Sequence, residues 1–170
     1  MGNEILIRDA ALEELDIIEE LVKAAYSEFR PQFTEKVWQA WMDNVSQTVC
    51  APAGRLIVAV VGGVIQGAIK FYPDASQSGM GHWPEGVAAI RILAVSPAAR
   101  GRGYGTLLAR ECLRRAREHQ VAAIFLFTGE FMHAARHIYE KLGFRRVPEF
   151  DRDPGPIAYR LDLRTVSGEQ

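Results

Sequence analysis

A short apolar segment that leads through a glycine-rich turn into a helix constrains this chain of 170 residues more than any other feature. In order, it contains an apolar strand, a stop, alternate glycines and the start of a helix: Ile92-Leu93-Ala94-Val95-Ser96-Pro97-Ala98-Ala99-Arg100-Gly101-Arg102-Gly103-Tyr104-Gly105-Thr106-Leu107-Leu108. Glycines let backbone N–H groups converge without Cβ atoms in the way, and a helix N-terminus adds unpaired donors and a positive partial charge. Such a turn suits an anion such as a pyrophosphate. Two arginines, Arg100 and Arg102, favour a phosphate ligand over a turn that binds nothing.

The turn differs from two common nucleotide-binding loops. A P-loop would end in Gly-Lys followed by Ser or Thr, and the segment lacks that ending. The Rossmann fingerprint requires a third glycine, but Thr106 or Leu108 occupies its position, depending on which glycine opens the motif. The sequence therefore predicts a different kind of phosphate-binding turn.

Composition and charge are those of an ordinary globular chain. Apolar residues make up 48% of the sequence and charged residues 24%. At roughly 100–200 residues per domain, this length predicts one domain over residues 1–170. The 20 lysines and arginines nearly balance the 21 aspartates and glutamates, which leaves a net charge of −1. Because nucleic-acid-binding proteins usually carry a basic surface, we expect no nucleic-acid partner.

Membrane segments, export signals and metal sites are not expected either. Apolar runs such as residues 56–61 are far shorter than the ~20 residues that span a bilayer. Residues 1–4 lack the basic start of a secretory signal. Cys50 and Cys112 have no second cysteine or histidine at metal-ligand spacing. We predict a cytoplasmic protein with two reduced thiols, no metal and no membrane partner.

Helical and strand patterns interleave along the chain, which is typical of the α/β class. Asp9 is a candidate cap for the first helix, Pro31 its limit and Thr34 the N-cap of the second. Two β-rich segments around Gly62-Gly63 predict a hairpin. The expected strands are residues 5–8, 55–61, 64–72, 87–95, 121–128, 144–147 and 157–163. The expected helices are residues 12–25, 34–44, 106–119 and 133–142.

Two motifs together resemble the signatures of one enzyme family. The motif Arg100-x-x-Gly103-x-Gly105 resembles the acetyl-CoA signature, Arg/Gln-x-x-Gly-x-Gly/Ala, of the GNAT superfamily of N-acetyltransferases. The later sequence Ala135-x-x-Ile138-Tyr139-Glu140-Lys141-Leu142-Gly143-Phe144 resembles that superfamily's helix with its Tyr-x-x-x-Gly-Phe ending. The motifs stand at the family's usual separation, with a strand between them. The resemblance is close over residues 88–147, and the order of elements fits the whole chain.

This resemblance implies a fold and a co-substrate. The fold is a single-domain, mixed and twisted β-sheet flanked by helices, whose fourth and fifth strands splay apart around the pantetheine arm of acetyl-CoA. An unpaired strand edge supports this, since it can hydrogen bond to an amide-bearing arm. Met132 stands where many relatives have asparagine, so it would supply apolar contact only. The residues implied to bind acetyl-CoA, without a metal, are Leu93, Ala94, Val95, Arg100, Gly101, Arg102, Gly103, Tyr104, Gly105, Thr106, Met132 and Ala135.

Tyr139 is the catalytic residue that the resemblance implies. By spacing alone it shares the apolar face of a helix with Ile138 and Leu142, as a core tyrosine would. In the family, the tyrosine at this position commonly faces the thioester sulfur. A phenol of pKa ~10 can there protonate the departing CoA thiolate.

A general base is harder to identify. Many family members carry glutamate on the fourth strand, where this chain has Ala89. Glu85 and Glu130 are alternatives, as is water that relays the proton to bulk solvent. His133 and His137 fit helix-surface positions better.

The resemblance implies direct acetyl transfer from acetyl-CoA to a primary amine of a small molecule or a protein. The alternative is a non-catalytic acyl-CoA-binding sensor or regulatory module, which Ala89 keeps open and Tyr139 opposes. The acceptor would be selected by residues 26–41, 74–85 and 150–156, although each aromatic side chain there could simply pack locally. These aromatic and histidine residues are Tyr26, Phe29, Phe33, Trp38, His82 and Trp83.

Three further expectations concern surfaces and packing. The helix after the turn has a basic face that could meet the 3′-phosphate of CoA or remain solvated; its members are Arg110, Arg114, Arg115 and Arg117. Cys112 is in register with Leu108 and Ala116, so we expect it in the core. Alternation of apolar and polar residues over 157–163, near a possible sheet edge, together with the frequency of dimers among relatives, favours a homodimer.

Overall fold

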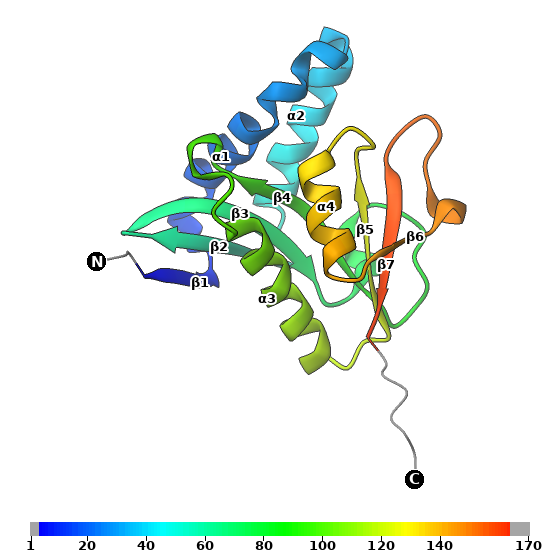
Figure 1. Cartoon of the computed structure of the whole chain (residues 1–170). Helices are drawn as coiled ribbons and strands as arrows, with labels where there is room; N and C mark the ends of the chain where they lie inside the picture. The colour runs from blue at the N-terminus through cyan, green and yellow to red at the C-terminus, as the bar shows by residue number, and fades with distance from the viewer. Residues whose placement is uncertain (1–3, 164–170) are drawn as a thin grey trace. The chain divides into compact units, whose positions relative to one another are not determined.

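A computed structural model describes residues 4–163 (Figure 1). Within these residues, four α-helices and the seven strands of a mixed β-sheet alternate along the chain, which confirms the α/β class. The chain divides into two compact units. The first contains the described residues up to Lys70 together with Ile92–Leu108, and the second contains Phe71–Arg91 together with the described residues from Ala109 onward.

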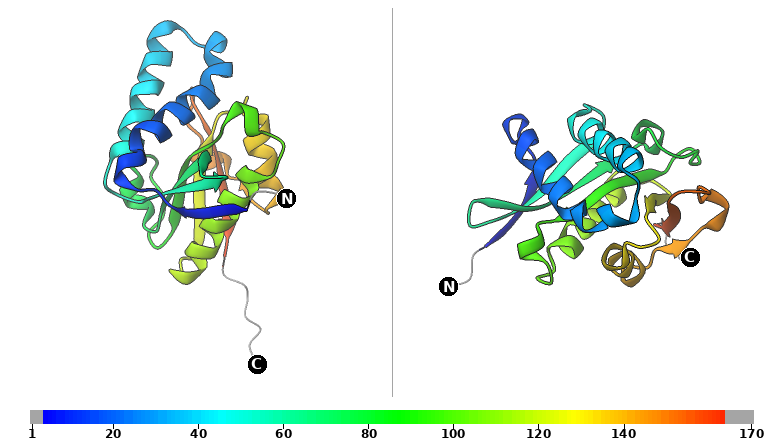
Figure 2. Two further views of the ribbon diagram at one scale, coloured as in Figure 1. Left: turned by 90° about the vertical axis from the view of Figure 1, so that its left-hand side faces the viewer. Right: turned by 90° about the horizontal axis from the view of Figure 1, so that it is seen from above.

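The first unit combines the N-terminal strands with a pair of helices. Its strand order is β1-β2-β3-β4, and β1 pairs with β2 in antiparallel register. Helices α1 and α2 run side by side in opposite directions, with a 3-10 segment between them (Figure 1; Figure 2). The elements are β1 (Ile5–Asp9), η1 (Leu12–Glu14), α1 (Leu15–Tyr26), η2 (Ser27–Gln32), α2 (Glu35–Cys50), β2 (Arg55–Val61), β3 (Val64–Tyr72), the end of β4 (Ala88–Val95), η4 (Pro97–Ala99) and the start of α3 (Tyr104–Glu118).

Apolar patterning explains the core of this unit. Ile18 and Val22 of α1 are completely buried, as is Val45 of α2, at the spacing expected for inward helix faces. Strand β2 is buried from Leu56 to Val60, because an interior strand covered on both faces is apolar without alternation. The predicted hairpin is confirmed, with φ values of +58° and +79° at Gly62 and Gly63.

The second unit is organised around β5. Its strand order is β4-β5-β7-β6, with β4 parallel to β5 and β7 antiparallel to both β5 and β6. Helix α4 lies against β5 and β7 (Figure 1), where Tyr159 Oη donates to Glu140 Oε2 at 2.5 Å and accepts from Arg136 Nε at 3.0 Å. The elements are η3 (Ala75–Ser78), the start of β4, the end of α3, β5 (Ala123–Thr128), α4 (His133–Lys141), β6 (Arg145–Arg146), η5 (Pro148–Phe150) and β7 (Ile157–Asp162).

Several predicted boundaries were wrong, for local reasons. Asp9 ends β1 instead of capping a helix, and α1 begins after a 3-10 turn. Helix α1 ends at Tyr26, ahead of Pro31. Helix α2 extends to Cys50 because the buried Lys70 Nζ donates to the carbonyl oxygens of Thr48 at 2.5 Å and Ala51 at 2.7 Å. These contacts satisfy oxygen atoms that a helix end leaves without partners.

Residues 157–163 lie near a sheet edge, as predicted, although the edge strand itself is the two-residue β6. Strand β7 lies between β5 and β6, and Ile157, Ala158 and Tyr159 are buried. The register of β4 with β5 covers Ala88–Ile90. Beyond this register, Phe127 and Thr128 of β5 still pair with β7. The family resemblance implies that the fourth and fifth strands separate at this point.

Two smaller predictions concern thiols and membrane segments. Cys50 and Cys112 are free, and Cys112 is completely buried, as expected for a core residue. Burial raises the pKa of the Cys112 thiol, which disfavours the nucleophilic thiolate. Across residues 4–163, no helix combines the length and the apolar character that a membrane span needs.

Candidate functional site

The glycine turn predicted to bind phosphate connects β4 with α3 in the first unit. Gly101 and Gly103 have φ values of +78° and +84°, in the left-handed region that side chains disfavour. A Cβ atom at either position would meet no other atom within 4 Å, so both glycines face open space. Gly105 instead lies buried in the first turn of α3. The turn therefore offers exposed backbone at Gly101 and Gly103.

The start of α3 supplies the polar groups of this turn. Its first backbone hydrogen bond runs from Leu107 N to Gly103 O at 3.1 Å. The N–H groups of residues 104–106 therefore belong to the first helical turn, where donors lack carbonyl partners within the helix and the helix dipole is positive. Exposed backbone at Gly101 and Gly103, next to such donors, fits a pyrophosphate, since an anion completes their hydrogen bonds.

The strand that precedes the turn departs from regular geometry at Ile92, whose φ is +50°. A β-branched residue is strained there, and such strain persists only where the surrounding structure imposes it. The strand is closely packed just beyond Ile92, because a Cβ atom added to Gly67 of β3 would lie only 3.1 Å from Ala94 O. Ala94 is buried, whereas Leu93 and Val95 are half-buried.

Two tertiary contacts join this segment to the end of α1. Tyr26 Oη donates to Leu93 O at 3.4 Å. Arg100 Nη2 donates to Ala25 O at 2.7 Å, and Arg100 Nη1 forms an ion pair with Glu28. Sequence reasoning identified Arg100 but missed Ala25 and Glu28, because one acidic residue in an acidic helical segment gives no distinguishing signal. Arg102 is exposed.

The remaining predicted site residues lie on and before α4 in the second unit. Tyr139 is 3% exposed and packs edge-on against Phe144, with 5.4 Å between ring centroids. Met132 and Ala135 are half-buried. Met132 Sδ accepts from Thr128 Oγ1 at 3.5 Å and from Gly129 N at 3.4 Å. Helix α4 ends at Lys141 with Leu142 as its C-cap, and Gly143 follows with φ +104°, in the left-handed conformation that glycine favours after a helix.

The candidate general bases also lie in the second unit. Ala89 is buried opposite Phe125 in the β4–β5 register, so this position supplies no carboxylate. Glu85 and Glu130 are exposed on loops. His133 and His137 are exposed on α4, as expected for surface histidines.

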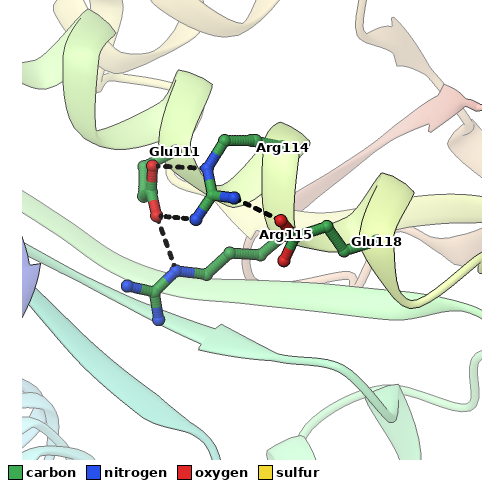
Figure 3. Close-up of polar contacts among 4 residues, drawn as sticks. All are labelled: Glu111, Arg114, Arg115 and Glu118. Atoms are coloured by element: carbon green, nitrogen blue, oxygen red, sulfur yellow. Dashed lines mark hydrogen bonds and ion pairs between the residues drawn. The ribbon is translucent and has the colours of Figure 1, made fainter.

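Figure 3 shows that two arginines of α3 are held by carboxylates of the same helix. Glu111 Oε2 accepts from Arg114 Nη2 at 2.7 Å and from Arg115 Nε at 2.8 Å, while Glu118 pairs with Arg114. These contacts hold the pKa of Glu111 at about 2, with the hydrogen bond from Arg114 as the largest cause. The network occupies both guanidiniums within the helix, which disfavours a CoA-binding role; Arg114 is exposed, as the solvated interpretation predicts, whereas Arg115 is mostly buried.

We expect Glu111→Gln to destabilise the protein by about 1–2 kcal/mol at pH 7, a range discounted for the solvent exposure of Arg114. The pKa of Glu111 falls from 4.5 to about 2 on folding, so its stabilisation is complete above pH 4.5 and is lost as the pH approaches 2. Urea unfolding of both proteins from pH 7 to pH 2 measures this difference. A difference that does not shrink in acid contradicts the assignment.

The aromatic residues of the predicted acceptor segments form one cluster in each unit. In the second, Trp83 stacks on Phe125 with 4.8 Å between centroids and lies 5.4 Å from Phe150. In the first, Tyr26 stacks on Trp41 at 4.9 Å. Local packing therefore accounts for much of the aromatic character of these segments. The remaining rings of the first cluster are Phe29, Phe33 and Trp38.

Among residues 4–163, no group of three or more histidine, cysteine, aspartate or glutamate side chains is arranged to hold a metal ion. The glycine turn and the end of β4 belong to the first unit, and α4 belongs to the second.

Comparison with known proteins agrees with this description. The model of the Acetyltransferase (GNAT) family matches residues 15–144. A mycothiol acetyltransferase of Rhodococcus jostii is 28% identical over 115 residues, which cover 68% of this chain and 34% of that protein. Human N-acetylaspartate synthetase is 27% identical over 140 residues, covering 77% of this chain and 44% of that protein. The chain thus spans between a third and a half of the length of these relatives.

Solved structures share the fold. A PaiA N-acetyltransferase of Thermoplasma acidophilum, in complex with coenzyme A, superposes with a TM-score of 0.73 over 94% of this chain and 99% of that one, at 13% identity. A GNAT family acetyltransferase of Brucella melitensis, in complex with acetyl-CoA, gives 0.66 over 95% and 90%, at 22% identity. These likenesses confirm the predicted architecture.

Proposed function

The chain belongs to the GNAT family of acetyltransferases, and on that premise we propose that it transfers an acetyl group from acetyl-CoA directly to a primary amine. The observation that carries the proposal is the open glycine turn at the start of α3. Gly101 and Gly103 keep their left-handed backbone with free space around them. Such open, exposed backbone at a helix N-terminus suits a bound diphosphate.

Different residues would contact different parts of acetyl-CoA. The main chain of Leu93, Ala94 and Val95 would hydrogen bond to the pantetheine arm, in the manner of an added strand. The backbone of residues 100–106 would hold the pyrophosphate. Met132 would contribute apolar contact, with Ala135 beside the same part of the molecule.

Tyr139 is proposed to act as the general acid. The amine nitrogen attacks the thioester carbonyl carbon, the carbon–sulfur bond breaks, and the sulfur takes the phenolic proton, which the tyrosine then regains from water. The amine loses its own proton to water, to Glu85 or to Glu130. Burial of the Tyr139 ring supports this role, because a fixed phenol can be held toward one reacting atom.

Water is the favoured proton acceptor on the amine side. Ala89 offers no carboxylate, and the exposed Glu85 and Glu130 are surrounded by solvent. An amine that has already lost its proton in solution needs no dedicated base, so such an enzyme would work best at alkaline pH.

We also propose an acceptor class, a location and an oligomeric state. The acceptor is a primary amine of a small molecule or a protein, selected by the segments that carry the two aromatic clusters. A cytoplasmic location is proposed because both cysteines are free thiols. A homodimer is proposed because dimers are frequent among family members, and sedimentation at micromolar concentrations would test it.

The test couples a binding measurement to an activity measurement. Calorimetry with CoA and acetyl-CoA measures binding, and CoA release over a panel of amines measures turnover. Since the exposed Cys50 would react with a thiol dye, the release assay uses Cys50→Ser protein. We expect binding of both ligands and release with at least one amine. Binding without release on every amine would support the sensor alternative, and absence of binding would overturn the proposal.

A further inference from the structure

The end of α1 contacts the proposed acetyl-CoA segment at two places. Tyr26 Oη reaches Leu93 O on the strand, and the Arg100 side chain, at the start of the turn, reaches Ala25 O and Glu28. All of these residues belong to the first unit. The contacts lie on either side of Ser96-Pro97, where the chain leaves β4, so they can fix the direction in which the turn departs from the strand.

The contact of Arg100 with α1 has a clear physical basis. Ala25 lies in the last turn of α1, where carbonyl oxygens lack partners within the helix and the helix dipole is negative. The guanidinium of Arg100 donates a hydrogen bond to Ala25 O and brings positive charge to this helix end, and it also forms an ion pair with Glu28. Its donors are thereby directed toward α1.

Resting on the proposed function, we infer that Glu28 is a positioning residue for acetyl-CoA, acting through Arg100. The Arg100 side chain stays on Glu28 and Ala25, while the backbone of the turn that it anchors receives the pyrophosphate. Glu28 thus increases CoA affinity, although its own charge has the same sign as that of the ligand.

The direction of the change in CoA affinity on removing Glu28 distinguishes a positioning role from two simpler roles. If Glu28 acted only through its charge, removing it would strengthen the binding of an anionic ligand. If Arg100 were a direct phosphate ligand for which Glu28 competes, removing Glu28 would again strengthen binding. Only an anchored turn predicts weaker binding when a negative charge is removed.

A matched control lies in the same part of the chain. Arg30 pairs with Glu35 at 2.9 Å, and neither residue contacts the glycine turn through these atoms. The carboxylates of both pairs are exposed, by 48% for Glu28 and 72% for Glu35. Exposed pairs contribute little to stability, so both Glu28→Ala and Glu35→Ala are expected to fold.

The experiment is calorimetric titration of CoA into the wild type, Glu28→Ala, Arg100→Ala, the double variant and Glu35→Ala. We expect Glu28→Ala to bind CoA about 3- to 10-fold more weakly, as suits a contact between exposed groups, with Glu35→Ala within about twofold of the wild type. The double variant should match Arg100→Ala within about twofold, because both changes remove one interaction. Glu28→Gln, which keeps an oxygen for Arg100, should recover part of the affinity.

Other outcomes overturn the inference. Unchanged or tighter CoA binding by Glu28→Ala shows that Glu28 does not position the turn. Additive losses in the double variant show that Arg100 and Glu28 act separately. A Glu28→Ala protein that melts well below Glu35→Ala without CoA, and is not rescued by Glu28→Gln, assigns the pair to folding alone. If the wild type itself does not bind CoA, the proposed function fails and this inference fails with it.

Discussion

Replacing Tyr139 with phenylalanine should lower kcat about 10- to 100-fold, the lower part of the range for general acid catalysis, because CoA is a tolerable leaving group. Acetyl-CoA affinity should stay within about twofold of the wild type, since the buried ring that packs on Phe144 remains. A pre-steady-state measurement is required, because slow product release could conceal a loss in the chemical step.

Tyr72→Phe is the matched control for this change. Tyr72 is also buried in the second unit, and burial raises its pKa, which the positive charge and the hydrogen bond of Arg91 partly offset. Loss of this hydrogen bond should reduce stability slightly and leave kcat within about twofold. If Tyr139→Phe also keeps its chemical step within twofold of the wild type, Tyr139 is a core residue and the general acid must be sought elsewhere.

Replacing Gly103 with valine should weaken CoA binding about 10- to 100-fold, because a branched side chain would fill the space before the backbone donors of the turn. Valine at a positive φ also costs about 1–3 kcal/mol in stability, so the loss of binding needs a control. Gly63→Val supplies it. Gly63 has φ +79°, close to the +84° of Gly103, and likewise no atom within 4 Å of an added Cβ, but it lies in the β2–β3 hairpin.

Calorimetry and thermal unfolding of the two variants separate the effects. Both should unfold at lower temperature than the wild type, and only Gly103→Val should lose affinity for CoA. Equal affinity in the two variants, with both folded, would falsify the assignment of the turn to the pyrophosphate.

Residues close together in sequence were enough to predict the class of fold and the turn that carries the proposed function. Local chemistry is sufficient for these features. Paired glycines at 62 and 63 adopt the positive φ values that a tight hairpin needs, and Gly143 follows the C-cap of α4. Alternate glycines between an apolar strand and a helix place Gly101 and Gly103 in an open turn.

The distant residues that contact that turn, and the ends of some elements, depend on packing in three dimensions. Helix α2 continues to Cys50 because Lys70, on β3, reaches its last carbonyls. Ile92 holds a φ of +50° that no β-branched residue prefers. Glu28 meets Arg100 only because α1 ends beside the strand that leads into the turn. Propensity and periodicity describe neighbours along the chain, whereas these contacts depend on packing between segments far apart in sequence, which no local pattern encodes.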